Sequence, residues 1–387
     1  MICFFDWLKS FTNNLTTNIV YADIAKAFDS VSHPKLLAIL QSYRISYQIV
    51  HWIKNFLSNR HQQVVINDSV SSFAKISSGV SQGSVLGPLL FLIFINNIQD
   101  CALSMGNQGA ISLFADDTKL YSTDSHKLQT SLNSVCDFLI THQLKLAPQK
   151  CVVLHASKPS LKVKISNQNF YLKNQVISSQ SVFKDLGIYI SDDLKWSHHI
   201  SYIVKNASCS LYHILKIFKT RNIWTLLKLY TTYVRPKLEY ATSVWSPYLK
   251  KDITKVESIQ KRFTKFAFLR SQIPFSSYND RLFKINIKSL QYRRVVFDLI
   301  LTYKIIYGLS DINFNDYFYF KQPSYNLRGN PKKICSKFNF QSQPLHNCFF
   351  IRAARYWNYL PSQVVCASSL SLFKCQLKTF DLTPLLV

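Results

Sequence analysis

Two adjacent carboxylates, Asp116 and Asp117, directly follow the apolar run Ile111-Ser112-Leu113-Phe114-Ala115. Like charges at the end of an apolar strand repel each other and are costly to desolvate, so the pair indicates a compensating charge. A third carboxylate, Asp23, ends a similar run that begins at Asn18. Two strands that each end in aspartate at one edge can hold two divalent cations, an arrangement used for phosphoryl transfer. On these residues alone, an ordinary turn or helix cap remains the alternative for the Asp-Asp pair.

Short elements are predicted between and after the acids. Before the pair these are a helix from Ser32 through Leu40, a helix over 50–57, a hairpin over 63–76, a loop with three glycines over 79–88 and a helix over 89–98. After the pair they are a helix over 128–139, a strand over 152–154 and a hairpin over 183–190. Glycines ahead of a helix N-terminus let a backbone approach a ligand, although flexible loops of this kind are common.

The charge is divided unevenly along the chain, which has a formal net charge of +26. Residues 1–150 hold 11 basic and 9 acidic side chains, whereas residues 151–387 hold 35 and 11. Beyond residue 194 the apolar spacing predicts long helices with lysine and arginine on their outer faces. A nearly neutral part with carboxylates and a strongly basic part suit a protein that chelates cations and follows a phosphate backbone.

Composition indicates an intracellular protein. The start, Met1 to Trp7, has neither the basic lead nor the long apolar run of a signal peptide. The longest apolar run, Val85 to Ile95, is too short to span a bilayer, so no membrane segment is predicted. The nine cysteines include no CxxC pair, and reduced thiols are expected.

The order of the motifs resembles the reverse transcriptase of non-LTR (LINE-type) retrotransposons. An acid-tipped strand with Ala27-Phe28-Asp29 comes first, then Gln82-Gly83 with Leu86-Gly87-Pro88, then Phe114-Ala115-Asp116-Asp117. The resemblance continues through segments that reach close to the C-terminus: Lys150, 183–188, 194–200, 240–245, 259–262, 357–361 and 368–373.

The resemblance implies a role for each matching residue. Asp23 and Asp116 would bind two Mg²⁺ ions, with Asp117 assisting and Mn²⁺ as a substitute. Lys150 would protonate pyrophosphate. The bulky residue that crowds a ribose 2′-hydroxyl corresponds to Phe28, and the residues against the templating base pair are Gln82 and Gly83. Taken without the motif, Phe28 reads as a core aromatic and Lys150 as a surface lysine.

The implied protein is an RNA-directed DNA polymerase whose partners are an RNA template, a DNA primer and dNTPs. The resemblance also implies access to the nucleus, so the expected compartment is the nucleus, the cytoplasm or both. The implied fold is α+β, with a palm of antiparallel strands backed by helices, an α-helical thumb and a small C-terminal subdomain. We expect the palm over 1–193, the basic helical thumb over 194–305, and a connector with a small subdomain over 306–387.

The family also has an extensive fingers region upstream of the first catalytic strand, and commonly an endonuclease domain before it. Only 22 residues precede Asp23 here, so the expectation is a chain truncated at its N-terminus. Whether a separate chain supplies the fingers or the endonuclease stays open. Two functions are therefore weighed: an active polymerase, and an inactive remnant that only binds nucleic acid.

Overall fold

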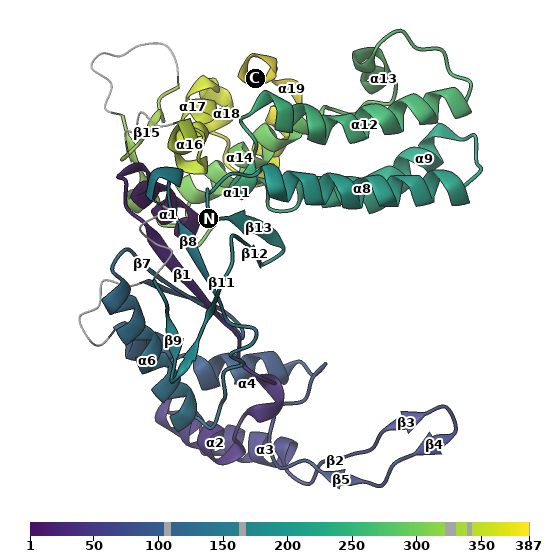
Figure 1. Cartoon of the computed structure of the whole chain (residues 1–387). Helices are drawn as coiled ribbons and strands as arrows, with labels where there is room; N and C mark the ends of the chain where they lie inside the picture. The colour runs from purple at the N-terminus through teal and green to yellow at the C-terminus, as the bar shows by residue number, and fades with distance from the viewer. Residues whose placement is uncertain (104–109, 162–167, 322–329, 339–342, 387) are drawn as a thin grey trace. The chain divides into compact units, whose positions relative to one another are not determined.

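The computed structural model describes residues 1–103, 110–161, 168–321, 330–338 and 343–386 (Figure 1). Helices and strands are both present, and the chain divides into two compact units. One unit is residues 13–183, and the other combines residues 1–12 with residues 184–387. The predicted α+β class, with a sheet backed by helices, is confirmed. The further division into palm, thumb and C-terminal subdomain remains a prediction.

The unit of residues 13–183 is built on a five-stranded sheet in the order β11-β8-β1-β7-β6. Its pairs are antiparallel except for β11 with β8, which is parallel. The strands are β1 (Thr17–Ala22), β6 (Ala110–Phe114), β7 (Asp117–Ser122), β8 (Val152–Ala156) and β11 (Ser178–Ser179). All six residues of the central strand β1 are buried, as expected for a strand covered on both faces.

Helices supply most of the rest of this unit's core. Buried side chains of β1, β7 and β8 form one cluster with those of α2, α3, α4, α5 and α6. These helices are α2 (His33–Ser42), α3 (Tyr47–Leu57), α4 (Leu86–Ile95), α5 (Ile98–Leu103) and α6 (Ser125–Thr141). The predicted helices are therefore confirmed, except that the one expected over 89–98 is two helices, α4 and α5.

The predicted hairpin over 63–76 is confirmed as a long ribbon that extends from the end of α3 (Figure 1). Its strands are β2 (His61–Gln62), β3 (Val65–Ile66), β4 (Ser69–Val70) and β5 (Ala74–Lys75). The turn lies at Asn67, whose φ of 51° is the left-handed conformation that asparagine tolerates well. The unit also contains η1 (Phe28–Ser30), η2 (Pro159–Leu161), β9 (Tyr171–Leu172) and β10 (Gln175–Val176).

The second unit is mainly helical, as its apolar spacing predicts. The hairpin of β12 (Val182–Asp185) and β13 (Ile188–Ser191) leads into it. Its main helices are α8 (Ser197–Ile217), α9 (Ile223–Leu229), a π-helix (Tyr230–Val234), α10 (Arg235–Glu239), α11 (Thr242–Trp245), α12 (Lys250–Arg270), α13 (Tyr278–Lys284) and α14 (Leu290–Ile306). The lysines at 205, 216, 255, 261 and 265 on α8 and α12 are exposed, which confirms the predicted basic outer faces.

The first helix of the chain, α1 (Ile2–Thr12), belongs to this second unit. Its Phe5 ring packs edge-on against Tyr317, Phe338 and Phe350, with ring centroids 4.8–5.9 Å apart. The elements at the end of the chain are α15 (Phe314–Tyr317), β14 (Phe318–Phe320), β15 (Ile334–Ser336), α16 (Gln343–His346), α17 (Phe349–Tyr359), α18 (Ser362–Val365), α19 (Leu370–Thr379) and η4 (Thr383–Leu385). The predicted connector lies partly outside the described residues.

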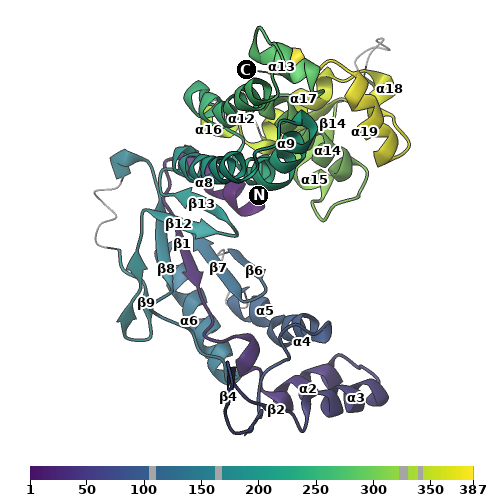
Figure 2. The same ribbon diagram turned by 90° about the vertical axis from the view of Figure 1, so that its right-hand side faces the viewer.

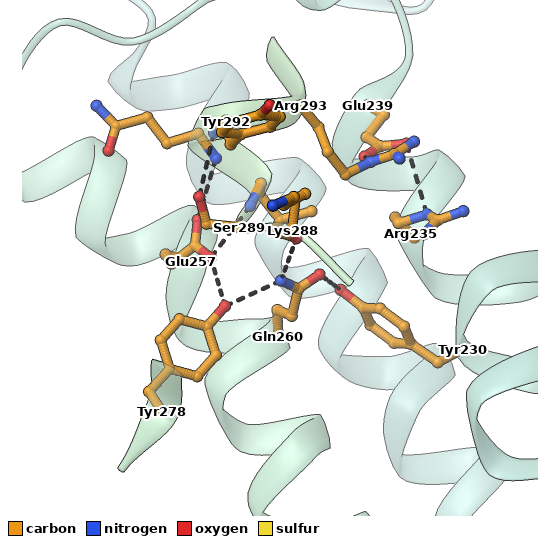
Figure 3. A network of polar contacts seen from close by, with 12 residues as sticks. Tyr230, Arg235, Glu239, Glu257, Gln260, Tyr278, Lys288, Ser289, Tyr292 and Arg293 are labelled. Atoms are coloured by element: carbon orange, nitrogen blue, oxygen red, sulfur yellow. Dashed lines mark hydrogen bonds and ion pairs between the residues drawn. The ribbon is translucent and has the colours of Figure 1, made fainter. Parts of the chain in front are cut away.

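A polar network ties α12 to the start of α14 (Figure 3). The buried Glu257 carboxylate accepts hydrogen bonds from the Tyr278 hydroxyl and from the backbone N–H groups of Leu290 and Gln291. Those N–H groups belong to the first turn of α14, which has no intrahelical partners for them. Glu257 therefore acts as a tertiary cap, and its charge is favourable at a helix N-terminus.

His199, in the first turn of α8, is buried between two tryptophans. Its ring meets those of Trp196 and Trp245 edge-on, with centroids 6.4 and 5.1 Å away, and its Nδ1 accepts a hydrogen bond from the Tyr189 N–H. Burial, assisted by the charge of His198, lowers the pKa of His199 to about 4. The histidine is thus a neutral core residue at pH 7.

This depressed pKa predicts that stability falls with acidification. The unfolded chain takes up the proton near its ordinary pKa of about 6.5, whereas the folded chain resists protonation down to about 4. Stability contributed by neutral His199 is therefore present above pH 6.5 and is lost as the pH falls toward 4. Between pH 7 and pH 5 we expect a loss of about 2 kcal/mol from this group. Urea unfolding at both pH values tests this, and His199→Gln, which does not titrate, should show a pH dependence smaller by that amount.

Candidate active site

The strand register brings three predicted site residues together at one end of the sheet. On one side of β1, Ala22 pairs with Thr118 of β7, so Asp23 and Asp117 follow as the next residues on adjacent strands. On its other side, Tyr21 pairs with Val152 of β8, so the same count places Lys150 across from Asp23. Asp116 lies in the turn that joins β6 to β7.

The β6–β7 turn has only two residues, Ala115 and Asp116, because Phe114 pairs directly with Asp117. Ala115 has a φ of 54°, in the left-handed region that costs a residue with a Cβ roughly 1–2 kcal/mol. Strained backbone of this kind persists where the surrounding structure holds it, and it is frequent at functional sites. Here it fixes the position of Asp116 at the tip of the hairpin.

Ala115→Gly is expected to stabilise the chain by roughly 0.5–1 kcal/mol, since glycine adopts positive φ without a steric penalty. The midpoint of urea unfolding measures the change. Ala110→Gly at the start of β6 is the matched control, because its backbone is ordinary strand and the substitution there should destabilise by a similar amount. Destabilisation by both variants would contradict the claim that the backbone at Ala115 is strained.

Asp23 is held by a cation. The Lys150 Nζ lies 3.2 Å from the Asp23 Oδ2, with the Asp23 side chain 30% exposed and the Lys150 side chain 70% exposed. The Oδ2 atom itself is buried and makes no hydrogen bond among the described residues, so its contact with Lys150 is an ion pair without hydrogen-bond geometry. Asp23 therefore has a buried oxygen whose bonding capacity is unfilled.

This unfilled oxygen is the feature that suits a divalent metal ion. Mg²⁺ and Mn²⁺ prefer carboxylate oxygens, and Asp23, Asp116 and Asp117 offer only such ligands. Among the residues that the structure describes, no group of three or more His, Cys, Asp and Glu side chains is gathered closely enough to hold a metal ion. The three aspartates have the donor chemistry that suits a divalent cation, but their side chains are not gathered into a complete metal site in the described structure; Asp23 is the best prepared ligand.

Phe28 belongs to a neighbouring group of residues. Its ring stacks on the fully buried Phe91 of α4, with centroids 4.5 Å apart. The Phe28 carbonyl also accepts a hydrogen bond of 2.8 Å from the Val80 N–H, which ties η1 to the glycine-containing loop. Phe28 is half-buried, so it combines a packing contact with a partly accessible edge.

Gln82 and Gly83 lie in that loop and are connected to η1 through Asp29. The Gln82 Nε2 donates a hydrogen bond of 2.8 Å to the Asp29 Oδ1. Gly79 contacts the same segment so closely that a Cβ there would lie 2.7 Å from the Asp29 carbonyl oxygen. Gly83 has a φ of 80° and open space around it. The loop is therefore anchored at Gly79, while Gly83 has open space around it.

A polar pocket of about 650 Å³ lies between this loop and the base of the ribbon. Lys26, Arg60 and Lys75 line it together with Asp29 and Gln82. The Arg60 guanidinium donates hydrogen bonds to the carbonyls of Leu57 and Gly79. The other two cations of the lining are Lys26 and Lys75. The sequence predicted Gln82 as a site residue, but not Asp29, Lys26 or Arg60. These residues line one pocket only because segments about 20–50 residues apart in the sequence contact each other.

None of the helices in the described part of the chain combines the length and the apolar character needed to cross a bilayer.

Comparisons with known proteins agree with the motif order. The family model described as "Reverse transcriptase (RNA-dependent DNA polymerase)" matches residues 5–201. The retrovirus-related Pol polyprotein from type-1 retrotransposable element R2 of Popillia japonica is 27% identical over 46% of this chain and 31% of its own length. The RNA-directed DNA polymerase from mobile element jockey of Drosophila funebris is 27% identical over 63% of this chain and 28% of its own length.

The matched parts thus span about 30% of these curated relatives. Among solved structures, telomerase from Candida albicans, in complex with a fragment of telomeric RNA, gives a TM-score of 0.49 at 13% identity. That match covers 99% of this chain and 54% of the telomerase chain.

Proposed function

Because the chain belongs to the reverse transcriptase (RNA-dependent DNA polymerase) family, with relatives among non-LTR retrotransposons, we propose that it is an RNA-directed DNA polymerase. The reaction is transfer of a nucleotide from a dNTP to the 3′-hydroxyl of a DNA primer on an RNA template. The observation that supports it most is the strand register, which sets Asp23 between Lys150 and Asp117 beside the Asp116 turn.

In this proposal Asp23 and Asp116 would hold two Mg²⁺ ions, with Asp117 assisting and Mn²⁺ as a substitute. When bound, such ions lower the pKa of the attacking hydroxyl and offset the charge that develops on the transferred phosphate. Asp23 would contribute its buried Oδ2, which accepts no hydrogen bond among the described residues and has the Lys150 ammonium 3.2 Å away. The turn at Ala115 keeps Asp116 at the tip of its hairpin.

Lys150 is proposed to donate a proton to the leaving pyrophosphate. Its ammonium is largely exposed and is oriented by Asp23, so it can meet a ligand without being buried. Removing a general acid typically costs 10²–10⁴-fold in rate. We expect Lys150→Ala to slow single-turnover nucleotide addition about 100-fold. Lys145→Ala, at another exposed lysine in the segment before β8, is the matched control and should leave the rate unchanged.

Phe28, Gln82 and Gly83 are proposed to select the nucleotide. Phe28 would crowd a ribose 2′-hydroxyl and favour dNTPs, and its stacking on Phe91 would keep the ring in place. Gln82 and Gly83 would lie against the templating base pair, with Gln82 oriented by Asp29. A separate chain that supplies fingers or an endonuclease is a further proposed partner.

Primer extension tests the function and separates it from nucleic-acid binding alone. A labelled DNA primer annealed to RNA is incubated with the chain, dNTPs and Mg²⁺, with and without excess EDTA, and binding to the same duplex is measured by fluorescence anisotropy. Extension that EDTA abolishes supports the polymerase. Salt-dependent binding without extension would instead identify the chain as a binding remnant.

A further inference from the structure

A groove between α14 and α19 lies in the second unit, outside the unit that carries the aspartates. The two helices pack side by side in both views (Figure 1, Figure 2). The groove has a volume of about 650 Å³, within the range of about 300–1,000 Å³ typical of pockets that hold a small ligand. We call it the α14–α19 groove; its lining comes from residues 286–300 and 374–378.

The floor of the groove is apolar and the rim is basic. Val296, Phe297 and Ile300 of α14 face Leu377 of α19, because they lie three and four residues apart on one side of α14. Lys288, Lys374 and Lys378 are exposed at the rim. The lining includes no aspartate or glutamate among the residues that the structure describes.

Two acidic residues near the groove set its net charge. Arg293, also in the lining, is bound by both carboxylate oxygens of Glu239, which also forms an ion pair with Arg235 (Figure 3). The Arg293 guanidinium lies 5.3 Å from the centroid of the Phe297 ring. Asp381 interacts electrostatically with Lys288. Among the described residues of the groove lining, Lys374 and Lys378, one helical turn apart on α19, are the lysines without an acidic partner.

We propose that the α14–α19 groove binds single-stranded nucleic acid. Phosphates lie beside Lys374 and Lys378, with Lys288 at the end of the groove, and a base packs on the Phe297 side of the floor. A basic rim over an aromatic and apolar floor is the combination by which proteins hold single strands without reading sequence. Duplex nucleic acid, whose bases are stacked inside the helix, could use only the rim.

The inference goes beyond the proposed polymerase, because binding in this groove needs none of the aspartates of the sheet. A single-stranded stretch of RNA or DNA satisfies the chemistry equally well. An acidic peptide would satisfy the lysines but offers no flat base for the floor, so it is the competing occupant that the experiment must exclude.

The test measures anisotropy of labelled oligo(dT) and oligo(rU) with the full chain carrying Asp116→Asn, without dNTPs, over a series of salt concentrations. Lys374→Ala/Lys378→Ala should weaken binding about tenfold and flatten the slope of log affinity against log salt by about 1.4, two contacts at about 0.7 each. Lys321→Ala/Lys333→Ala removes two exposed lysines from the same unit outside the groove, and it should change neither.

Phe297→Leu keeps the floor apolar but removes the ring. It should weaken binding about fivefold or more with an unchanged salt slope, since stacking on an aromatic ring is not a counterion effect. Thermal unfolding confirms that each variant is folded. Equal effects of the two lysine pairs, or no effect of Phe297→Leu, would overturn the proposal. Binding of a labelled acidic peptide by the chain, without binding of an oligonucleotide, would also overturn it. Comparing oligo(dT) with oligo(rU) decides between DNA and RNA as the preferred strand.

Discussion

Asp116→Asn is expected to lower DNA synthesis at least about 1,000-fold. The substitution keeps the size and shape of the side chain in the β6–β7 turn but removes the charge that would bind a divalent cation. Loss of an electrostatic contribution of about 4 kcal/mol to the transition state corresponds to about three powers of ten in rate. Single-turnover extension of a primer by one nucleotide measures the effect without interference from product release.

Asp68→Asn is the matched control for this variant. Asp68 is an exposed acid at the turn of the ribbon over 61–75, so its replacement removes the same charge away from the sheet. Its rate should equal that of the unaltered chain. The free energies of unfolding of the two variants, measured in urea, should agree within about 0.5 kcal/mol. A rate for Asp116→Asn within about tenfold of that of the control would contradict the assigned role of Asp116.

Asp298→Ala is expected to destabilise the second unit by about 3–5 kcal/mol. Asp298 on α14 is 1% exposed and accepts hydrogen bonds from Nε and Nη2 of the buried Arg352, at 2.8 and 3.3 Å. Burial alone would lower the pKa of Arg352, and the charge of Asp298 more than offsets this. One turn earlier, Arg294 is also buried, and neither of its Nη atoms has a hydrogen-bond partner among the described residues.

Removing Asp298 would leave the buried Arg352 guanidinium without its carboxylate partner, and it would leave Arg294 with the charge of Glu257 alone. Tryptophan fluorescence during urea unfolding is suited to the measurement, because Trp7, Trp196, Trp245 and Trp357 are buried in this unit. Asp311→Ala, at an exposed acid of the same unit, is the control and should stay within about 0.5 kcal/mol. A loss below about 1 kcal/mol for Asp298→Ala would show that water or a local rearrangement compensates the charge.

Much of the sheet around the site could be predicted because its signals are local. Apolar runs that end in an acid at Asp23 and Asp116 are confirmed as strand β1 and the β6–β7 hairpin. Lys150 precedes a short apolar run that forms β8. The antiparallel register then brings these residues together without any further signal. Their catalytic roles remain predictions.

Other features could not be predicted because they depend on tertiary contacts. Ala115 is not a residue type that favours positive φ, so nothing in its identity indicates the strained turn. The apolar face of α1 predicts burial but not the aromatic cluster that it joins, whose other rings lie more than 300 residues later. Arg294 and Asp298 have the spacing of an exposed ion pair on a helix, yet both are buried because α17 supplies Arg352 opposite them.

The most direct test of the central claim is single-nucleotide incorporation on RNA templates that differ only in the templating base. The unaltered chain and Asp116→Asn are compared side by side with Mg²⁺ and each dNTP in turn. We predict that the unaltered chain adds the complementary dNTP to the primer on every template and that Asp116→Asn adds none within the same time. Binding of the primer–template without any addition by the unaltered chain, or equal addition by both proteins, would contradict the proposed polymerase.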